Sequence, residues 1–236
     1  RLPVGDEDVK GTYDRFARCT HGALIRNDFE WMEYWRWENE EERTAAVYYD
    51  AKDIPQGFLL YWVEEDVFHI REMVYLTQEA RKGLWNFIRA HYSMIDAVKG
   101  HIYTGEPLAF LLDESQIQET IEPYFMARIV DVAQFLRLYP FEGSIRPFHF
   151  VVTDPMAEWN NGIFSVATDR EGTVSVTDEP AGKAVELDIQ TLSAMLMGYK
   201  RPSYLARIER LHTDKRTLRL LEEIIPDGQP YFSDYF

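Results

Sequence analysis

The last seven residues of the chain, 230–236, carry four aromatic side chains and end on one of them. Chain ends are usually polar, because ordering a free end costs entropy. An aromatic chain end is stabilised when it lies in a pocket, since burial of each ring removes a large apolar area from water. The sequence therefore predicts a fold that encloses its own C-terminal segment.

An enclosed segment would also enclose the α-carboxylate of Phe236. Such a carboxylate normally titrates near pH ~3.5. Desolvation against aromatic rings raises its pKa toward the range in which a carboxylate acts as a general base. A structural plug, with the carboxylate bound by an arginine or a helix N-terminus, is the simpler interpretation. Composition alone leaves both open.

Bulk composition limits the partners that the chain can have. Its 236 residues are 46% hydrophobic, enough for a sizeable core in one or two domains. The formal charge of −15 argues against a nucleic-acid partner and is compatible with a cationic amine substrate. No stretch approaches the ~20 apolar residues of a membrane helix, so we expect no membrane partner. The single cysteine, Cys19, excludes an intramolecular disulfide and points to a reducing, cytoplasmic compartment.

Hydrophobic periodicity predicts an α+β chain of two units that meet near residue 130. For residues 1–130 it predicts helices at 14–19, 28–37 and 77–92, strands at 44–49, 56–63, 67–76, 101–104 and 120–130, and an apolar turn at 107–112. For residues 131–236 it predicts a helix at 131–138, then antiparallel strands at 146–153, 163–168, 173–177 and 184–189. Residues 170–172 and 180–182 suit hairpin turns. Helices are expected at 191–197, 203–210 and 214–225.

Several catalytic and binding motifs are absent from the sequence. There is no Gly-x-Ser-x-Gly elbow, no Walker loop and no dinucleotide fingerprint. The six histidines lack ligand spacing, so we expect no metal site, and His91 is expected to be a core histidine. A basic cluster over 200–219 could meet an anion, although a solvated or interfacial helix face explains it more simply.

Four segments together resemble the Eis-like acetyltransferases of the GNAT family. They are residues 72–85 (EMVYLTQEARKGLW), 126–132 (MARIVDV), 198–203 (GYKRPS) and the closing 230–236 (PYFSDYF). Their order and spacing span nearly the whole chain.

The resemblance implies a protein of three parts. The first is a GNAT domain that binds acetyl-CoA, the second a degenerate GNAT domain, and the third a sterol-carrier-protein-2-like domain whose C-terminus returns to the active site. It assigns 1–130 to the second part and 131–236 to the third. It further implies that the first GNAT domain is absent here, in agreement with a chain that opens on Arg1, and that the parent protein is a homo-oligomer.

Residues 81–86 (RKGLWN) support the assignment of a degenerate domain. A working GNAT domain holds pyrophosphate on an Arg/Gln-x-x-Gly-x-Gly/Ala turn at a helix N-terminus. Here the glycine falls one position early, and Leu84 and Asn86 replace the small residues. A Cβ at these positions obstructs close approach of the backbone to phosphate. We therefore expect no cofactor-binding residues in this chain, with acetyl-CoA bound by the absent N-terminal GNAT domain.

The resemblance also assigns roles in acetyl transfer to a primary amine, such as an aminoglycoside, a polyamine or a lysine. Phe236 supplies its terminal carboxylate as the general base, and a tyrosine of the absent domain is the general acid. Asp131 matches an acidic position beside the substrate cavity, although it is equally explained as a helix N-cap. Tyr235 would line the same cavity.

A second hypothesis is a non-catalytic module that binds an apolar ligand or lipid. Sterol-carrier-like folds can enclose such ligands, and five side chains of the second unit could line a cavity: Phe148, Phe150, Phe164, Val166 and Val174. Ordinary core packing explains these residues more simply, because the C-terminal segment would compete for the same space.

Overall fold

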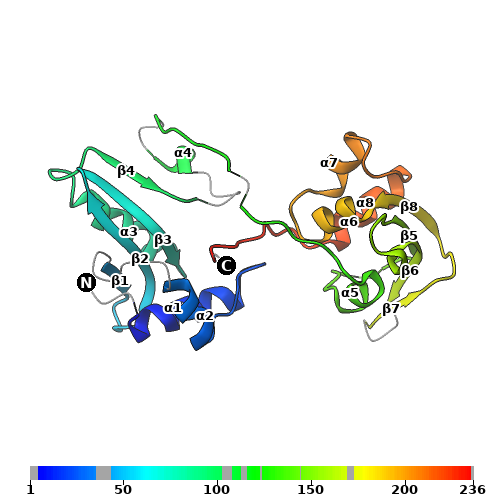
Figure 1. Ribbon diagram of the computed structural model, residues 1–236, viewed down its shortest axis with the longest axis horizontal. Coiled ribbons are helices and arrows are strands. Elements are labelled where there is room, and N and C mark those ends of the chain that lie inside the picture. Colours follow the sequence, from blue (N-terminus) through cyan, green and yellow to red (C-terminus); the bar gives the residue numbers. More distant parts are fainter. Residues whose placement is uncertain are drawn as a thin grey trace. The chain divides into compact units, whose positions relative to one another are not determined.

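The computed structural model describes residues 5–35, 44–102, 108–112, 116–122, 124–143, 145–168 and 173–234. The chain divides into two compact units. The first combines Arg1–Glu119 with Tyr231–Phe236, and the second is Thr120–Pro230. Each unit has its own four-stranded sheet (Figure 1). The first unit is therefore discontinuous in sequence, because the end of the chain returns to it.

The first unit is a sheet with helices on both faces. Its strands are ordered β1-β2-β3-β4, with β1 to β3 antiparallel and β4 parallel to β3. The elements are α1 (Glu7–Arg18), α2 (Asp28–Trp35), β1 (Thr44–Tyr49), β2 (Pro55–Glu64), β3 (Val67–Tyr75), α3 (Gln78–Arg89), β4 (Ala97–Gly100) and α4 (Leu108–Leu111).

The central strand β2 is buried on both faces. Phe58 and Leu60 pack in one core cluster with side chains of α1 and α2. Leu59 and Tyr61 pack in another with side chains of α3. Strands covered on both sides have continuous apolar runs rather than alternating ones, which explains this sequence.

A bulge in β3 directs one acidic side chain into the core. The register with β2 steps from Leu60 opposite Glu72 to Tyr61 opposite Ile70, so Arg71 is an extra residue. A bulge interrupts the alternation of a strand and can re-aim a side chain. Ile70 consequently packs with the α3 cluster, whereas Glu72 contacts residues of the opposite face.

The predicted elements of the first unit are largely confirmed, with two differences. The first helix begins at Glu7 rather than near residue 14, because the Asp6 side chain caps it by accepting from the Asp8 amide. The strand predicted at 101–104 is absent at 101–102, and residues 103–104 lie outside the described residues; a strand lies instead at Ala97–Gly100 and pairs with the start of β3. Residues 36–37 of the second predicted helix lie outside the described residues.

The second unit has a sheet of order β7-β6-β5-β8, and helices complete its core. Its elements are α5 (Val132–Leu138), β5 (Phe148–Thr153), a 3₁₀ turn (Glu158–Asn160), β6 (Gly162–Thr168), β7 (Val174–Thr177), β8 (Lys183–Asp188), α6 (Ile189–Leu196), α7 (Pro202–Arg207) and α8 (Lys215–Ile224).

The hairpin turn predicted at 180–182 is wrong. Strand β8 pairs with β5 in parallel on the far side of the sheet, so the connection from β7 crosses over. Hydrogen bonds hold this crossing segment: the Ala181 amide donates to Ser165 Oγ at 3.0 Å, and the Ala181 carbonyl lies 2.9 Å from His149 Nδ1. Gly182 has φ +67°, and a Cβ there would meet the Pro147 carbonyl oxygen. The predicted turn at 170–172 lies outside the described residues.

The strand predicted at 120–130 is also wrong. The described residues of this stretch form no strand, and their backbone groups bond to side chains instead. The Ile129 amide donates to Ser193 Oγ at 3.1 Å, and the Val130 carbonyl accepts from Trp159 Nε1 at 2.8 Å. Met126 is 95% exposed, so its apolar character reflects no burial within the unit.

Candidate functional site

A buried polar cluster joins the C-terminal segment to the core of the first unit. Its centre is Glu72 on β3 and Arg26 on the loop before α2, and their side chains are fully buried. Ser233 and Asp234 enter it from the other end of the chain. Figure 1 shows this segment, in red, returning to the unit that contains α1 and β3.

Glu72 accepts five hydrogen bonds, and two of them come from the C-terminal segment. Tyr231 Oη donates to Oε1 at 2.9 Å and Ser233 Oγ donates to the same oxygen at 2.6 Å. Arg26 donates to both oxygens at 3.3 Å, and Tyr34 Oη donates to Oε2 at 3.0 Å. A buried carboxylate is tolerated only when it is bonded in this way.

Arg26 is held between aromatic rings while it bonds to the tail. Its guanidinium carbon lies 3.8 Å from the ring centre of Tyr13, 3.9 Å from that of Tyr34 and 4.7 Å from that of Trp31. Its Nε donates to Asp234 Oδ1 at 2.7 Å. Planar guanidinium groups stack on rings and bond in their own plane at the same time, which lysine cannot do.

The two carboxyl groups of the cluster respond differently to burial. Burial alone would raise the pKa of Glu72, but Arg26 and the Ser233 and Tyr231 hydroxyls hold that pKa below its usual value. Burial raises the pKa of Asp234, and the bond from Arg26 offsets this only in part. Glu72 is therefore the firmly ionised member, whereas holding Asp234 ionised carries a cost.

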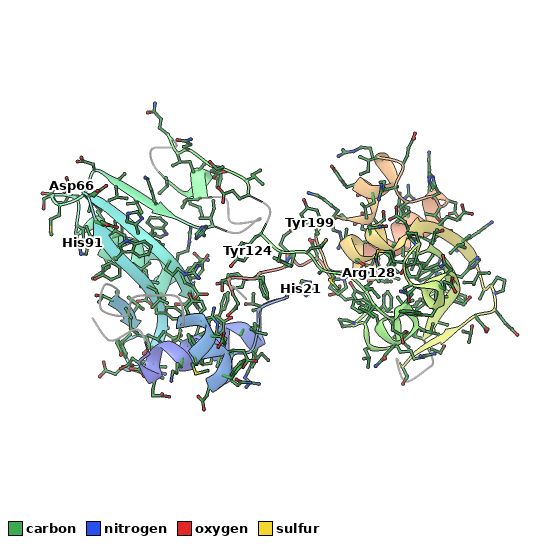
Figure 2. The ribbon with its side chains drawn as sticks, viewed as in Figure 1. His21, Asp66, His91, Tyr124, Arg128 and Tyr199 are labelled. Carbon is green, nitrogen blue, oxygen red and sulfur yellow. The ribbon has the colours of Figure 1, made fainter. Side chains whose placement is uncertain are left out.

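Further contacts attach the C-terminal segment beside the end of α1. The Tyr231 amide donates to the His21 carbonyl at 2.9 Å, and its ring meets that of Phe16 edge-on at 4.9 Å. Figure 2 labels His21 in the loop after α1. Tyr231, Ser233 and Asp234 are buried and Phe232 is half-buried, so the described part of the segment is largely enclosed.

The residues predicted to form the substrate site are only partly placed. Phe236 and Tyr235 lie outside the described residues. Asp131 is the N-cap of α5, where its Oδ1 accepts from the Gln134 amide at 2.9 Å. This confirms the capping interpretation of Asp131, and its role beside a substrate stays a prediction.

The segment 81–86 lies inside helix α3 and forms no phosphate-binding turn. Thr77 caps the helix by accepting from the Ala80 amide, and the Arg81 amide donates to the Thr77 carbonyl at 3.1 Å. Leu84 is 2% exposed and packs in the core. A Cβ on Gly83 would meet the Tyr48 ring at 2.3 Å. These residues do not fit the pyrophosphate of acetyl-CoA.

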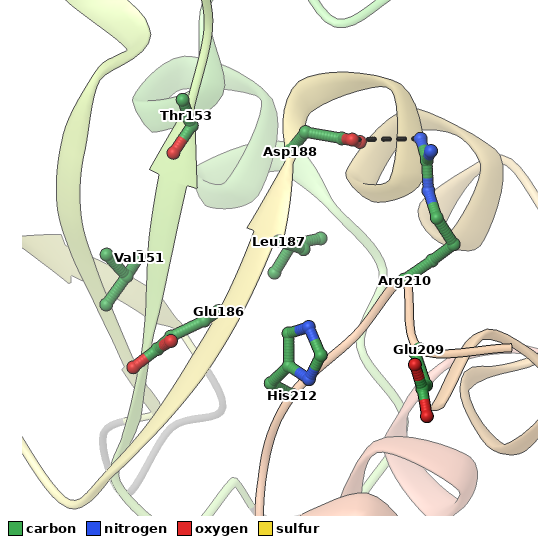
Figure 3. A pocket seen from close by; sticks show the side chains of 8 residues that line it. All are labelled: Val151, Thr153, Glu186, Leu187, Asp188, Glu209, Arg210 and His212. Atoms are coloured by element: carbon green, nitrogen blue, oxygen red, sulfur yellow. Dashed lines mark hydrogen bonds and ion pairs between the residues drawn. The ribbon is translucent and has the colours of Figure 1, made fainter. Parts of the chain in front are cut away.

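The second unit has an open hollow of about 420 Å³ beside β5 and β8 (Figure 3). Polar side chains dominate its lining, among them Glu186, Asp188, Glu209 and His212. Asp188 already caps α6 and accepts from Arg210 at 2.8 Å, so both of these side chains have structural partners. This hollow shares no residue with the predicted site.

Two more expectations concern metal and membrane. No group of three or more metal-ligating side chains occurs among the described residues. His91, labelled in Figure 2, is a buried core histidine whose Nδ1 lies 2.9 Å from the Phe87 carbonyl. Within the described part of the chain, none of the helices has the length and apolar character to cross a bilayer.

The side chains considered for an apolar ligand cavity belong to the core of the second unit. Phe148, Phe150 and Val166 are fully buried members, and Phe164 and Val174 pack against them. The basic residues of 200–219 are in part used structurally. Arg201 pairs with Glu222 at 2.8 Å and caps the end of α8.

The sequence analysis overlooked Arg26 and Glu72. Glu72 has one available signal, because it interrupts the alternating apolar series of β3 with an acidic residue at a buried position. Arg26 has none in its local sequence. Its role depends on tertiary contacts with residues 208 positions away.

Comparisons with known proteins agree with this architecture. The family profile of the acetyltransferase (GNAT) domain matches residues 22–129, and that of the sterol carrier protein domain matches 132–233. The N-acetyltransferase Eis of Mycobacterium tuberculosis is 24% identical over 233 residues, which cover 94% of this chain and 55% of the relative.

Solved structures extend the comparison to the fold. A "Probable N-Acyltransferase" from Enterococcus faecalis V583 has a TM-score of 0.89 and 30% identity over 100% of this chain and 60% of that one. A GCN5-related N-acetyltransferase from Anabaena variabilis has a TM-score of 0.82 and 26% identity over 100% and 61%. The chain thus spans a little over half the length of these relatives. Residues 22–129 thus match the acetyltransferase (GNAT) domain and residues 132–233 the sterol carrier protein domain, and the chain is similar to Eis-like proteins over nearly its whole length.

Proposed function

We propose that the chain is part of an N-acetyltransferase that moves acetyl from acetyl-CoA to a primary amine. The observation that carries this proposal is the fixed C-terminal segment. Ser233 and Asp234 of this segment are bound inside the first unit by buried hydrogen bonds to charged groups. These bonds fix the position from which the chain continues to Phe236. A catalytic group needs such a fixed attachment, because a small displacement of the group lowers the reaction rate.

In the proposed mechanism the terminal carboxylate of Phe236 is the general base. The amine arrives as an ammonium ion, and the carboxylate takes one of its protons. The neutral nitrogen would then attack the thioester carbon of acetyl-CoA as its C–S bond breaks, and the CoA thiolate would leave with a proton from the general acid, proposed to be a tyrosine of a further GNAT domain. Asp131 and Tyr235 are proposed to face the amine. Because residues 81–86 do not fit acetyl-CoA, a further GNAT domain of the parent protein is proposed to hold it, and the parent is proposed to be a homo-oligomer.

The test uses the parent protein that contains this chain. Intact mass first establishes that its last residue is Phe236. Converting the terminal carboxylate to a carboxamide keeps every side chain and removes the base, so kcat should fall by ~10²-fold or more while acetyl-CoA affinity stays unchanged. The matched control is Phe236→Leu, which keeps the carboxylate and should retain most of the turnover. Normal turnover by the carboxamide protein would refute the role of Phe236.

A separate titration tests the degenerate first unit. Calorimetry of this chain with acetyl-CoA should show no binding when circular dichroism shows a folded chain. Micromolar binding would mean that residues 1–130 hold a cofactor site after all.

A further inference from the structure

We propose that Arg26 and Glu72 form a built-in receptor for the C-terminal segment, and that Arg26 is a positioning residue for the reaction. Arg26 acts through Asp234 and touches no reacting atom. The receptor itself is inferred from contacts within the first unit. Its effect on catalysis rests on the proposed function, in which the group to be positioned is the Phe236 carboxylate.

The receptor is complete only when the segment is bound. Glu72 Oε1 accepts from Tyr231 and Ser233 of the segment, and Arg26 Nε donates to Asp234. Arg26 Nη2 also donates to Ser233 Oγ at 3.1 Å, so that hydroxyl bonds to both receptor residues. Removing the segment would leave buried charges with fewer partners, which is costly in a protein interior.

The charges of the cluster also favour this pairing. Glu72 and Arg26 compensate one another, and Asp234 of the segment is drawn to the remaining side of the guanidinium. The ring centres of Tyr13 and Tyr34 lie 3.8 Å and 3.9 Å from the guanidinium carbon and restrict the movement of that group. The position of Arg26 therefore sets the position of Asp234 instead of adapting to it.

The position of Asp234 limits the positions that Phe236 can reach, because the two residues are close together in the sequence. Phe236, the proposed base, is two residues beyond Asp234. Two residues span at most roughly 7 Å when fully extended. A shift of Asp234 by about 1 Å to 2 Å would be a sizeable fraction of this ~7 Å span. Displacements of about 1 Å at a catalytic group can lower the rate by ~10²-fold.

The test compares two substitutions in the parent protein and reads the segment directly. Carboxypeptidase A releases aromatic residues from an accessible chain end, so the release of Phe and Tyr reports whether the segment detaches. Arg26→Lys keeps the charge but loses the planar donors and should speed release by ~10-fold or more. It should lower kcat by at least ~10-fold with the KM for acetyl-CoA unchanged. Arg128→Lys, in an ion pair with Asp154 of the second unit, is the matched control and should change neither.

A milder pair covers the case in which Arg26→Lys does not fold. Ser233→Ala removes the hydroxyl that bonds to both receptor residues and should speed release, whereas Ser233→Thr keeps the hydroxyl and should restore protection. Release from Arg26→Lys and Ser233→Ala at the wild-type rate would overturn the receptor. Faster release of Phe and Tyr with an unchanged kcat would support the receptor but overturn the positioning role of Arg26. The same result would count against Phe236 as the general base. The carboxamide protein described above tests the base itself.

Discussion

Arg26 shows how one buried charge can be made tolerable by several kinds of contact at once. Two tyrosine rings cover its faces, and carboxylates of Glu72 and Asp234 accept its donors. The nearby anions raise its pKa above the usual value, although burial acts in the opposite direction. The same contacts raise the pKa of Tyr34 well above its ordinary value through burial and the neighbouring Glu72 charge. Both groups therefore keep their protons throughout the physiological range.

Tyr34 and Tyr13 provide a matched pair of substitutions at this site. Both rings lie against Arg26, but Tyr34 donates to the Glu72 carboxylate at 3.0 Å, whereas the short hydrogen bond of Tyr13 goes to the neutral Leu24 carbonyl at 2.9 Å and its contact with Asp234 Oδ2 is longer, at 3.5 Å. Bonds to charged groups contribute about 2 kcal/mol and neutral ones about 1 kcal/mol. We expect Tyr34→Phe to lower the free energy of unfolding by about twice as much as Tyr13→Phe in urea titrations. Equal losses would show that the ring contacts dominate.

At the scale of elements, local patterns predicted most helices and strands but not their pairing. Caps and periodicity located α3 and α5 because those signals lie within a few residues of the element. The bulge at Arg71 and the parallel return of β8 depend on which strand lies alongside, and no local residue type encodes that. The aromatic end of the chain predicted its burial, but the receptor that binds it could not be predicted, since its two halves come from distant positions.

The N-cap of α5 gives a prediction that separates two roles of Asp131. Asparagine caps as well as aspartate, whereas alanine does not, so Asp131→Ala should destabilise the second unit by about 1 kcal/mol and Asp131→Asn by only a few tenths. Thermal unfolding measures this difference. In the parent protein, a higher KM for the amine in Asp131→Asn than in the wild type would support the proposed contact of Asp131 with the substrate. An unchanged KM would leave capping as the whole role.

At the scale of the whole molecule, each unit has its own core and its own buried carboxylate network. In the second unit, Asp154 accepts hydrogen bonds from Arg128 at 2.7 Å and from Asn160 at 2.9 Å. Burial would raise the pKa of Asp154, but these donors and two backbone amides hold it well below its usual range. A carboxyl group whose pKa is lowered by folding stabilises the folded state above its unfolded pKa, and this contribution is lost as the pH falls through the folded pKa.

We therefore expect calorimetry to show two unfolding transitions, one for each unit. Asp154→Asn should lower one of them, and this loss should shrink on acidification below pH ~4, because the carboxyl group of the unfolded wild-type chain then binds a proton while the folded one stays ionised. Tyr34→Phe should lower the other transition. If both substitutions lowered both transitions together, the two units would unfold as one cooperative body.

The discontinuous first unit also constrains how the protein is made. A ribosome releases the chain from its N-terminus, and domains generally fold as units during synthesis. Residues 231–234 emerge after the whole second unit, so Glu72 and Arg26 are synthesised long before these partners exist. The second unit is continuous and can fold as soon as its last helix is released. The first acquires its hydrogen bonds to Tyr231, Ser233 and Asp234 only afterwards, so a chain that stops within the second unit would leave Glu72 and Arg26 with fewer partners for their buried charges.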